Sequence, residues 1–200
     1  GIMNQFKLLV DNEISGNDSY RQLRIQSDYL TANISGGFSY KTLPITIKKL
    51  LHQYLPTLVE KPVAKCQKQN NLDFYAYFRG LDSISQLLDL SVELPSLPTI
   101  KGYIHEDKQQ IGLQAYIPNI NTSGAKMENI TISMSNHNDQ LDLSFYVLNH
   151  LPKNNPTAAK IGDIKANVHV RAKNDIVDLQ VELGNTDSVR NEGVIHLISK

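Results

Sequence analysis

Several features that commonly carry protein chemistry are absent from this chain. The chain of 200 residues has a single cysteine, Cys66, and no tryptophan. A single cysteine excludes an intramolecular disulfide and a zinc site built from several thiolates, but it leaves the redox compartment open. We therefore assign Cys66 no structural or reactive role.

An excess of charge of one sign is also absent. The chain has 20 basic and 20 acidic residues, so its formal net charge is zero. A protein that grips phosphate backbones needs a basic surplus, so we expect no nucleic-acid partner. No apolar run approaches the roughly 20 residues of a membrane span, and no signal peptide is recognisable. Because the start Gly1-Ile2-Met3 is typical of a trimmed expression tag, we expect a fragment whose membrane anchor lies elsewhere.

Patterns that would indicate an enzyme are missing as well. None of the histidines has a second ligand at metal-binding spacing, and no nucleophile elbow or phosphate-cradling glycine loop is present. The carboxylate pairs Asp11 with Glu13 and Asp139 with Asp142 flank turns, where carboxylates commonly serve solubility and bond the backbone. The sequence thus predicts a non-enzymatic protein with no catalytic residue, no metal site and no cofactor.

What the chain does have is strict alternation of apolar and polar residues over many short segments. Side chains alternate across a strand, so each segment puts apolar groups on one face and polar groups on the other. Short polar tips at 106–108, 136–139 and 173–175 separate the later segments, which is typical of antiparallel hairpins. The apolar positions include Leu23, Ile25, Leu30, Ala32, Ile34, Leu72, Phe74, Ile100, Ile104, Ile111, Leu113, Ile130, Ile132, Leu141, Leu143, Ile164, Val168, Val177 and Leu179.

Two segments change to a helical period. Thr42 can cap a helix that carries Pro44 in its first turn, and Pro56 ends this helix near Leu55. A second, short helix is predicted over 84–88. The expected apolar face of the first helix comprises Leu43, Ile47, Leu50, Leu51, Tyr54 and Leu58.

The predicted fold class is therefore mainly β: a long antiparallel meander curled into a trough or sandwich. Both helices are expected to pack on its apolar face. We treat 1–200 as one fragment, with strands and the amphipathic helix in 1–60, a polar connection over 61–71 and the β-meander over 72–200.

The chain resembles the TamB and AsmA-like proteins of Bacteroidetes at several points. The first is 29–44, YLTANISGGFSYKTLP, followed by an amphipathic helix that ends in Tyr54-Leu55-Pro56. The resemblance continues through 70–74, through 84–88 and through the step from Leu94-Pro95 into 100–102. It also includes 113–118, a strand that ends in proline.

This resemblance implies a periplasmic segment of a longer protein that is anchored in the inner membrane and reaches toward the outer one. Family members are elongated, curled β-sheets with an apolar inner surface. They are associated with phospholipid transport or with assembly of outer-membrane proteins. The implied partners are thus phospholipid or another acyl lipid and outer-membrane assembly proteins, and the family supplies no catalytic residues.

A curled sheet with an apolar inner face can shelter acyl chains, and each buried methylene contributes about 0.8 kcal/mol. Small residues on the same register, namely Ala32, Ala115, Ala166, Ala172, Gly36 and Gly102, are expected to leave room for a lipid tail. The lipid-groove candidates are Ala32, Ile34, Ile104, Leu113, Ala115, Ile132, Leu143, Ala166, Val168, Val170, Leu179 and Val181.

An alternative interpretation is a β-sandwich at the cell surface that binds glycan or protein. Tyr75, Tyr77, Tyr103 and Tyr116 fall on the polar side of their strands and can form an aromatic platform. A continuous open groove favours the lipid interpretation, whereas a closed core with a tyrosine-lined outer cleft favours the alternative.

Overall fold

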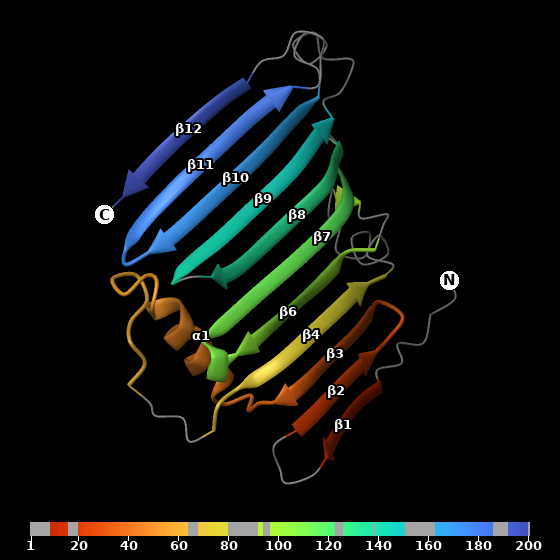
Figure 1. Cartoon of the computed structure of the whole chain (residues 1–200). Coiled ribbons are helices and arrows are strands. Elements are labelled where there is room, and N and C mark those ends of the chain that lie inside the picture. The colour runs from red at the N-terminus through yellow and green to blue at the C-terminus, as the bar shows by residue number, and fades with distance from the viewer. Residues whose placement is uncertain are drawn as a thin grey trace.

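A computed structural model describes residues 9–15, 20–63, 68–79, 92–93, 97–122, 126–137, 139–150, 163–185 and 192–199. This part of the chain contains twelve strands, one α-helix and one 3-10 turn (Figure 1). The elements are β1 (Leu9–Ser15), β2 (Tyr20–Gln26), β3 (Leu30–Gly37), α1 (Leu43–His52), β4 (Asn71–Phe78), β5 (Val92–Glu93), β6 (Thr99–His105), η1 (Glu106–Lys108), β7 (Gln110–Thr122), β8 (Lys126–His137), β9 (Gln140–His150), β10 (Ile164–Lys173), β11 (Ile176–Asn185) and β12 (Glu192–Ser199).

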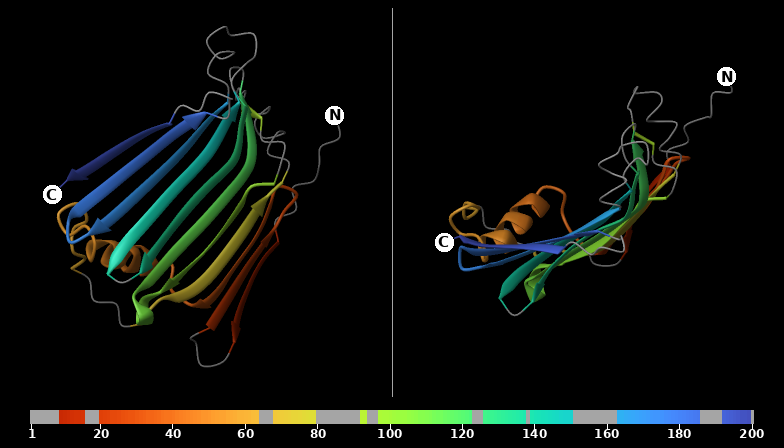
Figure 2. Two further views of the ribbon diagram at one scale, coloured as in Figure 1. Left: turned by 45° about the horizontal axis from the view of Figure 1, so that its top comes forward. Right: turned by 90° about the horizontal axis from the view of Figure 1, so that it is seen from above.

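All the described strands belong to one antiparallel sheet. Its order is β1-β2-β3-β4-β6-β7-β8-β9-β10-β11-β12, and the short β5 pairs with β7. The strand order therefore follows the chain order, as in a meander. The sheet is curved, and α1 lies on its concave side (Figure 2). The predicted curled, mainly β meander is confirmed in its open form, since no second sheet occurs within the described ranges.

The hairpin tips lie at the short polar segments that predicted them. β10 and β11 are joined by Asn174 and Asp175, whose φ angles are 52° and 63°. Two consecutive positive φ values are typical of the tight hairpin turn whose twist matches that of the flanking strands, and Asn and Asp are among the non-glycine residues that tolerate them best. The tip after β6 is the single turn η1, which ends at Gln109 with a φ of 54°.

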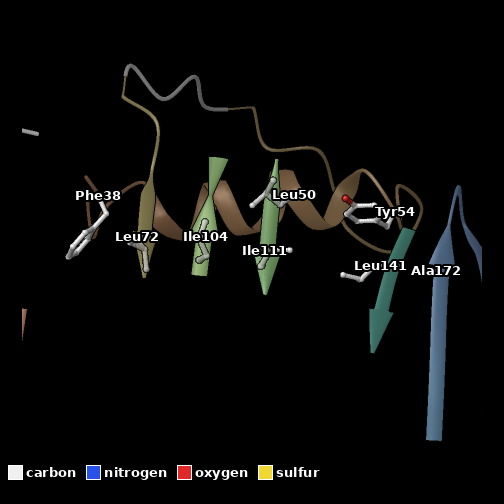
Figure 3. Packing of buried hydrophobic residues seen from close by; sticks show 8 residues of the cluster. All are labelled: Phe38, Leu50, Tyr54, Leu72, Ile104, Ile111, Leu141 and Ala172. Carbon is white, nitrogen blue, oxygen red and sulfur yellow. The ribbon is translucent and has the colours of Figure 1, made fainter. Parts of the chain in front are cut away.

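Helix α1 packs on the turn-proximal end of the concave face, meaning the end next to η1 and the tip at 174–175. Leu50 is fully buried and Tyr54 is 4% exposed. Figure 3 shows Leu50 and Tyr54 on the helix side of Leu72, Ile104, Ile111, Leu141 and Ala172, which come from β4, β6, β7, β9 and β10, and Phe38 beside Leu72. This cluster comprises Phe38, Leu50, Tyr54, Leu72, Ile104, Ile111, Leu141 and Ala172.

Three details of the helix prediction need correction. The helix ends at His52 rather than near Leu55. Leu58 is 75% exposed, because the chain has left the helical path before it and no longer presents it to the sheet. Thr42 does occupy the N-cap position, but its side chain makes no capping bond and donates instead toward Ser39 O and Asn70 Oδ1, both at 3.4 Å. The short helix predicted over 84–88 lies outside the described residues.

A buried polar network fixes the helix to the sheet. Thr46 is fully buried and donates a hydrogen bond of 2.8 Å to Glu106 Oε2. Asn70, which is 1% exposed, donates from its backbone to the same oxygen and from its amide to Thr46 Oγ1. Lys49 pairs with Glu106 Oε1 at 2.9 Å. Burial raises the pKa of Glu106, but these hydrogen bonds outweigh it and leave the pKa below its ordinary value.

Candidate functional site

The strand register brings the alternating apolar residues onto one face of the sheet. Leu72 pairs with Ile104, and Ile104 pairs with Ile111, which places all three under α1. The same face continues across the later strands through Leu143, Val170 and Leu179, which pair in turn. We call this concave surface the apolar face. All the lipid-groove candidates lie on it: Ala32, Ile34, Ile104, Leu113, Ala115, Ile132, Leu143, Ala166, Val168, Val170, Leu179 and Val181.

Helix α1 covers only one end of the apolar face. On β9, Leu141 is 8% exposed, whereas Leu143, the next residue on the same face, is 37% exposed. On β10, Ala172 is 3% exposed, whereas Val170 is half-buried. Leu183 on β11 is 45% exposed, farther still from the helix. Large aliphatic side chains thus remain accessible over much of the face, as in an open groove rather than a closed core.

Some of the small residues do not provide the space expected of them. A Cβ atom on Gly102 would lie 2.6 Å from the ring of Phe74, so that ring already fills the position. At Gly36, whose φ is 138°, a Cβ would meet the backbone of β4. Ala172 is buried beneath the helix cluster. Of the six small residues predicted to leave room, Ala32, Ala115 and Ala166 remain as half-buried positions on the apolar face.

The opposite, convex face is polar and carries the predicted tyrosines. Tyr75, Tyr77 and Tyr116 are 42%, 37% and 40% exposed. The rings of Tyr75 and Tyr77 lie 5.5 Å apart on β4, and Tyr103 stacks on His105 at 5.2 Å on β6. The four tyrosines thus lie on the polar face, as the sequence predicted, and Tyr75 and Tyr77 are in ring contact.

One histidine has a role that its sequence context did not indicate. His150 Nε2 lies 2.9 Å from Glu128 Oε2, and its Nδ1 lies 2.7 Å from Asp163 Oδ2. The hydrogen bond with Glu128 is the main cause that raises the pKa of His150, and Asp163 adds to it, while partial burial opposes it. The partners come from β8 and from just before β10, so only the strand pairing brings them together. Sequence spacing carries no signal for this cluster.

The remaining candidates from the sequence are possible metal ligands, Cys66 and the two carboxylate pairs. Among the described residues, no group of three or more histidine, cysteine or acidic side chains could hold a metal ion. Cys66 falls outside the described residues, and so do the side chains of Asp11 and Glu13. Asp142 accepts a hydrogen bond of 2.6 Å from Gln140, a neighbour on the same strand.

Comparison with known proteins adds no assignment. No protein-family model matches the chain, and neither the curated proteins nor the solved structures contain a significant match. No helix in the described part of the chain is long and apolar enough to cross a membrane.

Proposed function

We propose that this chain is a non-enzymatic periplasmic segment of an outer-membrane biogenesis or phospholipid-transport protein, and that its apolar face shelters acyl chains. The full-length protein is then anchored in the inner membrane, as the resemblance to TamB and AsmA-like proteins implies. Its partners are phospholipid or another acyl lipid and outer-membrane assembly proteins.

The observation that supports this proposal best is the exposure gradient along the apolar face. Leu141 and Leu143 belong to the same strand and the same face, yet only Leu141 is covered by α1. Beyond the helix, Leu143 pairs with Val170 and Val170 with Leu179, so the accessible apolar surface continues from strand to strand. A surface of this kind matches an acyl chain, which contributes hydrophobic contact but makes no directional bonds.

The curvature of the sheet adds a second argument. A concave face surrounds a bound chain on more than one side, and each methylene removed from water contributes about 0.8 kcal/mol. The candidates from Ile132 to Val181 offer similar aliphatic contacts on successive strands. Similar, weak contacts in a row allow a lipid tail to move along the surface, which a single deep pocket would oppose.

Native mass spectrometry of the protein purified from bacterial membranes tests this proposal, together with binding of a fluorescently labelled phosphatidylethanolamine. Leu143→Asp is the first variant, because Leu143 is 37% exposed and a charge there can be solvated without unfolding the sheet. Val168→Asp is the second variant. His169→Asp is the matched control, since His169 follows Val168 directly but lies on the convex face.

We expect co-purified phospholipid in the wild-type protein and its loss in Leu143→Asp and Val168→Asp, with circular dichroism unchanged at least for Leu143→Asp. The His169→Asp control should bind the labelled lipid as the wild type does. Lipid-free protein that also fails to take up the probe would contradict the proposal, as would equal binding by Leu143→Asp and the wild type.

The alternative, a β-sandwich that binds glycan or protein, would need a second sheet over the apolar face. The described strands all belong to one sheet. In its favour, Tyr75, Tyr77 and Tyr116 are exposed on the convex face.

A further inference from the structure

A polar cavity of about 670 Å³ lies at the turn-proximal end of the sheet. Residues of η1 and the start of β7, of the tip between β8 and β9, and of the tip between β10 and β11 line it, together with Gln53 and Tyr54, which directly follow α1. We call it the tip cavity. The buried Leu141 lies between Asp139 at the cavity and the exposed Leu143, so the tip cavity is distinct from the accessible part of the apolar face.

Tyr54 joins the walls of the tip cavity. Its backbone oxygen accepts a hydrogen bond of 3.0 Å from the backbone N–H of Asp175, at the tip between β10 and β11. Its hydroxyl oxygen accepts one of 2.6 Å from the amide nitrogen of Asn136 on β8. The same nitrogen donates to the backbone oxygen of Gln109, beside η1, also at 2.6 Å. The walls are thus held in place before a ligand binds, which lowers the ordering cost of binding.

The hydroxyl group of Tyr54 retains a proton that it can donate. Asn136 Oδ1 accepts a hydrogen bond of 2.7 Å from the backbone N–H of Ile111, which fixes the amide so that its nitrogen faces Tyr54. Because an amide nitrogen is only a donor, the Tyr54 oxygen is the acceptor of this pair. No acceptor for the hydroxyl hydrogen is bonded to it among the described residues. Tyr54 is only 4% exposed, so an occupant of the cavity with an acceptor atom would complete its hydrogen bonding.

The charges that line the tip cavity favour an anion. Lys108 and Lys173 line it, and in the described part of the chain neither ammonium group forms a hydrogen bond or ion pair. Asp139 is the only carboxylate among the lining residues that the structure describes. The fixed charges therefore leave one positive charge in excess.

The nearest other carboxylates are already engaged. Glu106 pairs with Lys49, and Asp175 accepts a hydrogen bond from the backbone of Thr57. Neither of these two carboxylates lines the tip cavity. The two lysines thus remain available to an occupant.

From this arrangement we propose that the tip cavity binds the phosphate group of a small phosphate monoester. Such a group carries more charge than a carboxylate and presents three acceptor oxygens, which can accept from Lys108, Lys173 and the Tyr54 hydroxyl together. The cavity is large enough to hold the body of the ester beside the phosphate, where the amides of Gln53 and Gln110 can bond its hydroxyl groups. This site does not depend on the proposed acyl surface.

Isothermal titration calorimetry with three ligands of related body tests the inference: glycerol 3-phosphate, glycerate with a carboxylate in place of the phosphate, and neutral glycerol. Lys108→Gln and Lys173→Gln each remove one exposed ammonium group from the cavity. Lys101→Gln is the matched control, because Lys101 is an exposed lysine on β6 outside the tip cavity. Asp139→Asn removes the opposing carboxylate. Thermal unfolding checks that each variant is folded.

We expect glycerol 3-phosphate to bind more tightly than glycerate, and glycerol not to bind measurably. Lys108→Gln and Lys173→Gln should each weaken glycerol 3-phosphate by about tenfold. Asp139→Asn should tighten it by about threefold, because a repulsive charge is removed. Lys101→Gln should bind as the wild type does.

A second measurement separates two sources of the phosphate monoester, a soluble molecule and a lipid headgroup. Co-sedimentation is measured with phosphatidylcholine vesicles, with and without phosphatidic acid. Binding to phosphatidic acid that Lys173→Gln abolishes would support the site and identify its ligand as a headgroup. Binding of glycerol 3-phosphate without such co-sedimentation would support the site and identify a soluble ester.

Three results would overturn the inference. The first is no saturable binding of glycerol 3-phosphate at millimolar concentration and no co-sedimentation that depends on phosphatidic acid. The second is binding that neither Lys108→Gln nor Lys173→Gln alters in a folded protein. The third is equal affinity for glycerol 3-phosphate and glycerate, since this would exclude selection of a phosphate group.

Discussion

The phenyl ring of Phe74 lies over Gly102, the residue directly opposite it on the neighbouring strand β6. A Cβ on Gly102 would lie 2.6 Å from Cζ of this ring and would also clash with the carbonyl oxygen of Gly112. On the other face, Tyr103 covers its own partner Gly112 in the same manner. Aromatic rings thus shield glycines on both faces of adjacent strands, a device that compensates for the poor strand propensity of glycine.

Gly102→Ala should destabilise the protein by about 1–3 kcal/mol, because the added methyl group overpacks a site that the ring and a backbone oxygen already fill. Chemical denaturation followed by circular dichroism measures this loss. Gly193→Ala on β12 is the control, since no atom lies within 4 Å of a Cβ there. We expect Gly193→Ala to be neutral or slightly stabilising. Equal effects of the two substitutions would show that Phe74 does not occupy the site.

Truncation of Leu141 and of Leu143 should have unequal effects on stability. Leu141 is 8% exposed under α1, so Leu141→Ala should lower the free energy of unfolding by about 2–4 kcal/mol. Leu143 is 37% exposed, so Leu143→Ala should cost less than about 1 kcal/mol. Urea denaturation of both variants makes the comparison. Equal, large losses would mean that the apolar face is closed beyond the helix.

Glu106→Gln should destabilise the docking of α1 by about 1–3 kcal/mol near neutral pH, because the carboxylate accepts bonds from Thr46, Lys49 and the Asn70 backbone. Asp107→Asn, at the exposed neighbouring position, should change stability by less than about 0.5 kcal/mol.

The same carboxylate makes stability depend on pH in a defined direction. Because its pKa is lowered in the folded protein, its contribution is present above its ordinary value of 4.5 and is lost as pH falls through the lowered pKa. The wild type should therefore lose stability in this acidic window more steeply than Glu106→Gln. Thermal unfolding at a series of pH values measures both slopes, and parallel curves would contradict the assignment.

His150 should titrate above its ordinary pKa of 6.5 in the folded protein, and the Glu128→Gln variant should lower that pKa. The folded pKa is raised, so the stabilisation is present below 6.5 and is lost as pH rises through the folded pKa. Proton NMR of the imidazole C–H resonances follows the titration directly. A His150 pKa that does not change in Glu128→Gln would exclude Glu128 as its main partner.

Alternation was a sufficient guide to the strands and to the apolar face, because a period of two determines which side chains share a face once neighbouring strands pair in register. The alternation alone placed Leu143 and Val168 correctly on the apolar face. The alternation could not predict that the ring of Phe74 covers Gly102 or which residues bond Glu106, since these contacts depend on which strands become neighbours. Glu106 looked like part of a solvated turn, yet it is 6% exposed and helps to dock α1.

Leu58 shows the converse error. Its spacing from Tyr54 fits a helical face, but α1 ends at His52 and the chain turns toward the tip at 174–175, where Asp175 Oδ1 accepts a hydrogen bond of 2.9 Å from the Thr57 backbone. Local periodicity extends a helix as long as apolar residues recur. The tertiary bond at Thr57 redirects the chain.

The strand order, which follows the chain order apart from β5, also determines how this protein folds and unfolds locally. Each strand on the main path depends on its immediate neighbours in the sheet, so cooperativity spreads in one dimension, as it does along stacked repeats. The segment beneath α1 has the most buried contacts and is the natural nucleus, from which hairpins can zip outward in both directions. Native-state hydrogen exchange should accordingly be slowest in β4, β6 and β7 and fastest in β1 and β12, where each outer edge lacks a partner among the described strands.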